Sequence, residues 1–253
     1  MGIQSMCFEG EMLKRGRPIR LLACVFAVVT VLSSVAHADL IADGGFEQPI
    51  VGPGGFNSGF QAFGVGQTIG SAWLVVGSGA GNVAVVPGTE TSSSPLVTLA
   101  PHGGSQSLDL TGDTDNGAAT GVEQVITTTP GTQYTLSFWV GDLNNAQYPF
   151  SGAASVSVFL NGSAFQTATN DGASGLTPNW ELFSYNFAAT GTSTTLDFIN
   201  NTKNVSNVVG LNGLDDASVN PATAGSVPEP SAILLMATLV ALTGLVVRRR
   251  PAA

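Results

Sequence analysis

The chain has 253 residues, of which 43% are hydrophobic and only 10% are charged. Disordered chains combine low hydropathy with high net charge, so this composition excludes that class. Seven of the eight Lys and Arg residues lie near the two ends, whereas residues 39–227 hold one cation, Lys203, against fourteen Asp and Glu. Nucleic-acid binding needs a basic surface, so the charge pattern excludes a nucleic-acid partner as well.

The N-terminal segment has the three parts of an export signal. A cluster of four Lys and Arg residues (14–20) precedes the apolar run 21–32, and Ala36-His37-Ala38 follows as an A-x-A cleavage site. Twelve apolar residues are too few to span a bilayer. We therefore predict that residues 1–38 are a signal peptide, removed by signal peptidase, whether translation starts at Met1 or at Met12.

Few residues that carry catalytic chemistry remain after this cleavage. Cys7 and Cys24 both lie in the signal, so the mature domain has no disulfide and no thiol. His37 is lost too, and His102 stands alone in a Gly-rich turn, where we expect an ordinary loop residue. No nucleophile elbow, phosphate loop or zinc-protease motif is present in the sequence. We expect no catalytic residues and a protein that is not an enzyme.

The body, residues 39–222, carries short alternating apolar runs between turn residues, which is typical of one all-β sandwich. The strongest run is Tyr134–Val140, in which alternate residues are apolar and one face is buried. Asn161-Gly162 predicts a two-residue hairpin turn, and Pro130-Gly131 a tight turn. Further strands are expected around 83–86, 96–99, 107–111, 122–127, 155–160, 183–187 and 196–198, with loops at 51–72 and 141–153. The total would be about nine or ten strands.

The C-terminal segment predicts a membrane helix. Residues 232–247 contain no charge and are followed at once by Arg248, Arg249 and Arg250. A helix of this length is about 24 Å long, short for a bilayer but workable with local thinning. The arginines would hold the end in the cytoplasm, which places the body outside. The two prolines around Glu229 keep the segment just before this apolar run extended and accessible.

This order of features resembles the PEP-CTERM sorting signal of exported bacterial proteins. The resemblance is carried by Val227-Pro228-Glu229-Pro230, the apolar helix and Arg248–Arg250, at the end of the chain. It implies an exosortase-type processing enzyme as partner, anchoring in the inner membrane through 232–247 before processing, and then a place at the cell surface or in an exopolysaccharide matrix. The chain thus divides into a signal peptide (1–38), a β-sandwich (39–222) and a sorting signal (223–253). An ordinary membrane anchor is the alternative for the tail.

The sandwich is similar to galactose-binding-like jelly rolls, which include carbohydrate-binding modules and choice-of-anchor surface proteins. The similarity rests on five motifs in order: Asp39–Glu47, Gly104–Gly112, Thr129–Phe138, Trp180–Phe187 and Leu214–Val219. The resemblance implies one structural Ca²⁺ between the first and last strands. Its ligands would be Glu47, Asp215 and Asp216, helped by carbonyls near Gly103–Ser105. The alternative is that the two aspartates are merely solvated.

A sugar site is the remaining question. Trp139 lies, by alternation, on the polar side of its strand, so it is a candidate stacking platform with Asn144 and Tyr148 beside it. Alternatively the 141–153 loop covers Trp139, while Trp73 and Trp180 are expected in the core. Two functions stay open: a non-enzymatic surface or matrix protein associated with exopolysaccharide, and a carbohydrate-binding module for one defined glycan.

Overall fold

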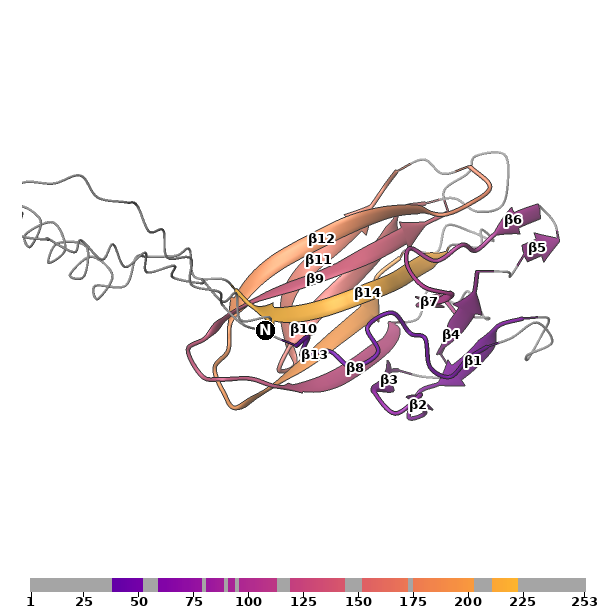
Figure 1. Ribbon diagram of the computed structural model, residues 1–253. Coiled ribbons are helices and arrows are strands. Elements are labelled where there is room, and N and C mark those ends of the chain that lie inside the picture. Colours follow the sequence, from indigo (N-terminus) through magenta and orange to yellow (C-terminus); the bar gives the residue numbers. More distant parts are fainter. Residues whose placement is uncertain are drawn as a thin grey trace, which may run out of the picture. The chain divides into compact units, whose positions relative to one another are not determined.

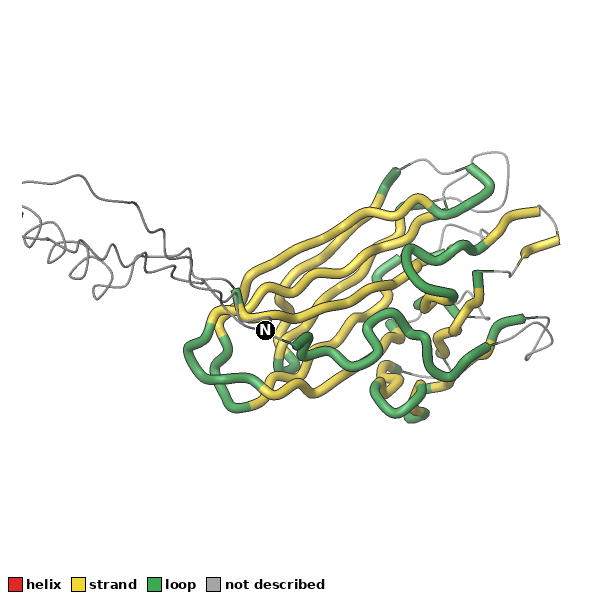
Figure 2. The backbone as a smooth tube through the Cα atoms, viewed as in Figure 1, coloured by secondary structure: helices red, strands yellow, loops and turns green. Residues whose placement is uncertain are grey.

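The computed structural model describes residues 38–51, 59–78, 81–88, 91–93, 96–112, 119–143, 152–172, 175–202 and 211–222. These residues form strands, turns and loops, and no helix occurs in the described ranges (Figure 2). Accordingly, nothing within them is a helix long and apolar enough to cross a bilayer. The predicted signal peptide, apart from Ala38, and the predicted membrane helix at 232–247 lie outside the described residues.

Two antiparallel sheets of six strands face each other (Figure 1). The first sheet has the order β1-β4-β7-β14-β9-β12. Its strands are β1 (Gln61–Gly64), β4 (Asn82–Pro87), β7 (Gln106–Asp109), β14 (Asn212–Pro221), β9 (Gln133–Asp142) and β12 (Asn179–Ala188). The last strand of the chain is therefore a central strand of this sheet, between β7 and β9.

The second sheet has the order β11-β10-β13-β8-β3-β2. Its strands are β11 (Ser163–Asn170), β10 (Ala154–Leu160), β13 (Ser193–Asn200), β8 (Thr120–Thr127), β3 (Trp73–Gly77) and β2 (Thr68–Ile69). A separate hairpin pairs β5 (Thr91–Ser93) with β6 (Leu96–Thr98). The expectation of one all-β sandwich is confirmed.

The core lies between the sheets and follows the alternation in the sequence. On β9, Tyr134, Leu136, Phe138 and Val140 are all buried, while Thr135, Ser137 and Trp139 between them are only partly buried. Phe138 meets Phe198 of the other sheet edge to face, with ring centroids 4.9 Å apart. The inward side chains of the first sheet thus pack against those of the second, because each sheet buries one apolar face against the other.

Two local predictions are confirmed. Asn161 and Gly162 both have positive φ, at 52° and 73°, in the turn between β10 and β11, as a two-residue hairpin of type I′ needs. The Pro130-Gly131 turn has Gly131 at φ 79°, and the Thr132 N–H donates to the Thr129 carbonyl at 3.1 Å.

One predicted loop was wrong in part, because the segment 51–72 contains β1 and β2. These strands have four and two residues, and turns that include Gly66 and Gly70 adjoin them. Such short runs carry no readable alternation. They are held by pairing with β4 and β3, which only the assembled sheets supply.

The first described residues pair with the last strand. Asp39 accepts hydrogen bonds from the N–H groups of Ile41 and Val219, and the Leu40 N–H donates to the Val219 carbonyl at 3.0 Å. Figure 1 shows the N-terminal end of the described chain beside the end of β14. The predicted mature N-terminus and the start of the sorting tail therefore leave the sandwich next to each other.

A pair of facing carboxyl groups lies on the outer side of the second sheet. Asp197 of β13 is directly opposite Glu123 of β8, so the two carboxyl groups are neighbours on the sheet. Burial, together with the neighbouring Glu123 carboxyl group, raises the pKa of Asp197 to about 6. The folded protein therefore holds a proton here that an unfolded chain, with an Asp pKa of about 3.9, has already lost.

We expect this pair to make the protein less stable as the pH rises from about 4 to about 6. In that window the native state binds more protons than the unfolded state, so the free energy of unfolding falls with pH and stays lower at pH 7. Asp197→Asn should flatten the dependence and add about 1 kcal/mol at pH 7, a figure reduced for partial solvent screening. Denaturant unfolding from pH 4 to 7 measures this, with exposed Glu181→Gln as the control. Parallel curves for wild type and Asp197→Asn would contradict the prediction.

Candidate functional site

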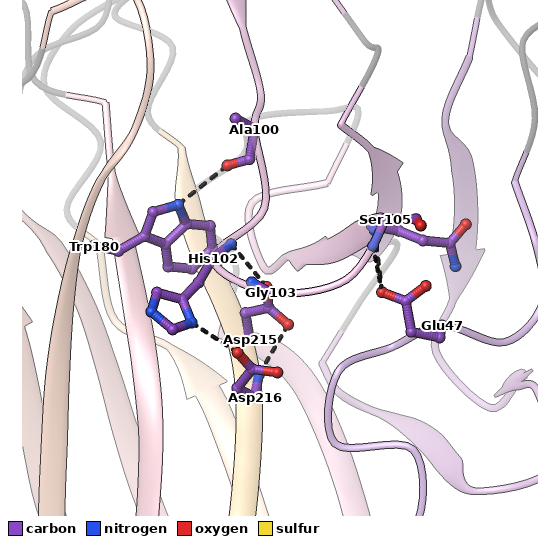
Figure 3. A network of polar contacts seen from close by, with 9 residues as sticks. Glu47, Ala100, His102, Gly103, Ser105, Trp180, Asp215 and Asp216 are labelled. Atoms are coloured by element: carbon purple, nitrogen blue, oxygen red, sulfur yellow. Dashed lines mark hydrogen bonds and ion pairs between the residues drawn. The ribbon is translucent and has the colours of Figure 1, made fainter.

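Three segments far apart in sequence meet at one junction on the first sheet (Figure 3). They are the 43–47 segment near the start of the sandwich, the 100–105 loop before β7, and the middle of β14. The junction brings together Glu47, Asp215 and Asp216, the three residues that the sequence assigned to a Ca²⁺ site. A Cβ placed on Gly45 would lie 3.4 Å from Asp216 Oδ1, 3.8 Å from Asp215 Oδ1 and 3.9 Å from Glu47 Cγ.

The 43–47 segment is a tight turn that aims Glu47 at the loop. Asp43 and Phe46 both have positive φ, and the Asp43 carboxylate accepts the N–H groups of Glu47 and Gln48 at 2.8 and 3.2 Å. Asp and Asn tolerate this left-handed backbone better than most residues, because their short side chains bond locally. Glu47 Oε1 then accepts the N–H groups of Ser105 and Gln106 at 2.8 and 3.2 Å.

Asp215 is fully buried and holds the opposite side of the loop. Its Oδ2 accepts the His102 and Gly103 N–H groups at 2.9 and 3.1 Å, and its Oδ1 accepts the Asp216 N–H at 2.8 Å. Burial and the charge of Asp216 raise the pKa of Asp215 to about 7, although these backbone donors oppose the rise. The carboxyl group thus lies where a positive charge would stabilise its ionised form.

Asp216 projects from an irregularity in β14. The pairing of β14 with β9 shifts register between Asp215 and Ser218, and Asp216 has φ 47°. This bulge turns the exposed Asp216 carboxylate toward the loop, where its Oδ2 lies 2.7 Å from His102 Nδ1. His102 is therefore more than the ordinary loop residue that the sequence suggested.

His102 also joins an aromatic group on the outer side of the first sheet. Its ring stacks on Trp139, with centroids 3.7 Å apart and planes 16° apart, and meets Trp180 edge-on at 6.2 Å. The Trp180 Nε1–H donates to the Ala100 carbonyl at 3.1 Å. One face of Trp139 is therefore covered by His102. The predicted neighbours Asn144 and Tyr148, and most of the 141–153 loop, lie outside the described residues.

The core assignment was right for Trp73 and wrong for Trp180. Trp73 is 1% exposed, stacks on Phe46, and donates from Nε1 to the Asp43 carbonyl at 2.9 Å. Trp180 is only partly buried and lies over Gly141 and Gly213, where an added Cβ would come within 2.8 Å of its ring. Glycine at both positions leaves the flat space that this indole occupies. The sequence of β12 indicates the outer position of Trp180, because Trp180 alternates in step with Leu182, Ser184 and Asn186, which are exposed on that side.

We call the outward side chains of β9, β12 and β14, with His102, the tryptophan face. It consists of His102, Thr135, Ser137, Trp139, Trp180, Leu182, Ser184, Asn186, Ser218 and Asn220. Half-exposed aromatic rings lie at one end of this face, and hydroxyl and amide groups fill the rest. Leu182, which is 51% exposed, lies opposite Trp139 on the neighbouring strand.

The described carboxylates do not form a metal site from side chains alone. Among the residues that the structure describes, no three His, Cys, Asp or Glu side chains are arranged to hold a metal ion. The carboxylates at the junction accept N–H groups of the chain instead. A cation there would need carbonyl oxygens or water to complete its shell, since Ca²⁺ takes six to eight oxygens.

The geometry defines an all-β sandwich with an acidic junction and an aromatic, polar outer face. The family model described as "Protein of unknown function (DUF642)" matches residues 39–210, and the chain belongs to this family. The PEP-CTERM protein-sorting motif matches residues 226–250, so the chain carries this sorting motif, as its tail predicted. No curated protein matches the chain by sequence.

Solved structures similar to this chain include sugar-binding proteins with a β-sandwich fold. The C-terminal domain of the sugar-binding protein EclA is 18% identical with a TM-score of 0.31, and the match covers 39% of this chain and 64% of that one, less than two thirds of it. A CBM4 structure is 16% identical with a TM-score of 0.35, over 72% of this chain and 99% of the other. The CBM22-1 xylan-binding domain of Paenibacillus barcinonensis Xyn10C is 17% identical with a TM-score of 0.38, over 64% and 92%.

Proposed function

We propose that this chain is an exported, non-enzymatic surface protein whose sandwich, a galactose-binding-like jelly roll, binds extracellular polysaccharide. Signal peptidase removes residues 1–38, the helix at 232–247 holds the protein in the inner membrane, and an exosortase-type enzyme then processes the tail for release to the surface or matrix. The sorting motif at 226–250 supports the export route. The tryptophan face carries the binding proposal.

Sugar recognition needs flat apolar surface together with hydrogen-bonding groups. Sugar rings stack their C–H faces on aromatic side chains, while their hydroxyls bond to polar groups nearby. The tryptophan face offers both: His102 and Trp180 beside Trp139, and the exposed Ser184 and Asn186 along the neighbouring strand. Aromatic residues that keep a polar handle and partial exposure are enriched at binding surfaces.

The charge of the sandwich favours a neutral polysaccharide. The described residues include eleven Asp and Glu and no Lys or Arg. An acidic surface repels anionic glycans at low ionic strength, so uronic-acid polymers are poor partners. Neutral chains, recognised by stacking and hydroxyl contacts, are the class that this face fits.

A structural Ca²⁺ at the junction belongs to the same proposal. Glu47, Asp215 and Asp216 supply hard oxygen ligands around Gly45, with carbonyls of the 103–105 loop as further ligands. Such an ion would add positive charge beside Asp215, where burial disfavours the ionised carboxylate. It would also tie the start of the sandwich to β14.

We expect Trp180→Ala to weaken binding of full-length protein to a neutral polysaccharide by about tenfold or more, since a Trp at the centre of an interface commonly contributes about 2 kcal/mol. Trp139→Ala should act in the same direction. Phe159→Ala removes a partly buried ring from the outer side of the other sheet and serves as the matched control. A glycan array finds the ligand, and isothermal titration gives the affinities.

The array also separates the two functions. Strong binding to one defined glycan supports a specific carbohydrate-binding module, whose direct evidence in this chain is the clustering of His102, Trp139 and Trp180. Weak binding to many neutral polysaccharides supports general matrix association. If no polysaccharide binds, or if the Trp variants bind as well as the Phe159 control, the binding proposal is wrong.

A further inference from the structure

Three unpartnered oxygens are buried at one end of the sandwich interior. Among the described residues, four buried side-chain oxygens have no hydrogen-bond partner, and three of them are Thr120 Oγ1, Asp142 Oδ2 and Asn212 Oδ1. Thr120 begins β8, Asp142 ends β9 and Asn212 begins β14. Because these strands are antiparallel to their neighbours, all three residues lie at the end opposite the Pro130-Gly131 turn.

Asp142 and Asn212 face each other on the core side of the first sheet. They are directly opposite partners of β9 and β14, two residues beyond the buried pair Val140 and Leu214 on the same side. Opposite residues of an antiparallel pair have Cβ atoms about 4.5–5.5 Å apart. Asp142 is 1% exposed and Asn212 is fully buried, so bulk water does not solvate either group.

The hydrogen bonds decide which atom of Asn212 is free. Its Nδ2 donates to the Ser155 carbonyl at 2.7 Å and to Asn200 Oδ1 at 2.8 Å. Asn200 Oδ1 also accepts the Thr202 N–H at 3.0 Å, so that atom is an oxygen. The amide of Asn212 can then be placed in one way only, with Oδ1 pointing away from both acceptors.

The two unpartnered atoms cannot satisfy each other while Asp142 is ionised, because both are acceptors. The neighbouring Asn170 is a contrast: its Nδ2 donates to the carbonyls of Val140 and Asn179, and its Oδ1 accepts from Gly172 N–H and Asn179 Nδ2. Asn170 is therefore fully paired, whereas Thr120, Asp142 and Asn212 each keep an unpartnered oxygen. What fits between two such oxygens is a donor or a positive charge.

We infer that Asp142 and Asn212 are two ligands of a buried Ca²⁺ site, separate from the junction at Glu47. A carboxylate and an amide oxygen are hard oxygen donors, the kind that Ca²⁺ prefers, and the Thr120 hydroxyl at the same end of the interior is a third of that kind. Asn212 and Asp215 lie on opposite sides of β14, which keeps the two sites apart. Burial and the charge of Asp171 also raise the pKa of Asp142 to about 7, although backbone N–H donors at Ala154 and Leu143 oppose the rise. The described residues include no Lys or Arg that could offset this charge.

Calcium stoichiometry of the full-length protein, purified in detergent and stripped with chelator, tests the inference. Asp142→Asn should bind one Ca²⁺ fewer per chain, and Ca²⁺ should raise its melting temperature less than it does for wild type. Asp197→Asn is the matched control. Asp197 carries the fourth unpartnered oxygen, and it lies on the outer side of the other sheet, away from Asp142. Glu47→Gln reports on the junction site, so its loss of an ion is counted separately.

Asn212→Asp gives an independent readout if Asp142→Asn fails to fold. This variant places a second carboxylate opposite Asp142 and loses the two hydrogen bonds that Asn212 Nδ2 donates, so its melting temperature in chelator should be lower. Ca²⁺ should raise that melting temperature by more than it raises the wild-type value. If Asp142→Asn binds as many ions as wild type, or if Ca²⁺ raises the melting temperature of Asn212→Asp no more than that of wild type, the inference is wrong, and a water or a shared proton fills the space instead. Neither variant touches the tryptophan face, so polysaccharide binding stands or falls by its own experiment.

Discussion

Replacing Pro228, Glu229 and Pro230 with alanine is expected to leave membrane insertion intact and to abolish processing of the tail. In the proposed topology hydrophobicity holds residues 232–247 in the bilayer, and the substitutions leave that run unchanged. Alanine favours a helix where proline prevents one, so the membrane helix would begin earlier and the extended segment before it would be lost. The protein should accumulate at full length in the inner membrane instead of reaching the surface.

Fractionation with antibodies to the sandwich and to a C-terminal tag reads this result directly. Ser226→Ala, just before Val227-Pro228-Glu229-Pro230, is the control and should be processed normally. Deletion of Arg248–Arg250 is a second variant. It should weaken the retention of the C-terminal end in the cytoplasm, because these charges would set the orientation of the helix. Normal cleavage and surface delivery of the triple-alanine protein would leave the tail as a plain anchor, and the processing part of the proposal would be wrong.

Gly104→Ala is expected to destabilise the sandwich by about 3 kcal/mol, since the substitution disrupts the junction in two ways. Gly104 has φ 60°, where a side chain costs about 1–2 kcal/mol. An added Cβ would also collide with Glu47 Oε1, the atom that accepts the Ser105 and Gln106 N–H groups. Hydrogen bonds to a charged group contribute about 1.5–3 kcal/mol each, and displacing Glu47 weakens both.

Gly131→Ala is the matched control for this effect. Gly131 also has a positive φ, 79°, but a Cβ there would have no atom within 4 Å. The control should therefore lose only the backbone contribution, about 1–2 kcal/mol. Denaturant unfolding of both variants measures the difference. Equal losses would mean that the contact between Glu47 and the 103–105 loop contributes nothing to stability.

The sequence alone determined the features that neighbouring residues encode. Alternation from Tyr134 to Val140 assigned the buried side of β9 and placed Trp139 on the outer side, because successive side chains of a strand point to opposite faces. The Asn161-Gly162 turn and the sorting tail were equally readable. In each case the information lies in a short segment and needs no knowledge of its partners.

The tertiary structure decided which distant segments meet. Asp216 and His102 are 114 positions apart and touch only because β14 enters the middle of the first sheet beside the loop that precedes β7. The pairing of Asp142 with Asn212, and the short strands β1 and β2, depend in the same way on strand register. Register between strands is set by packing across the whole sandwich, so the alternation within any one strand can predict which side a residue faces but not which residue it faces.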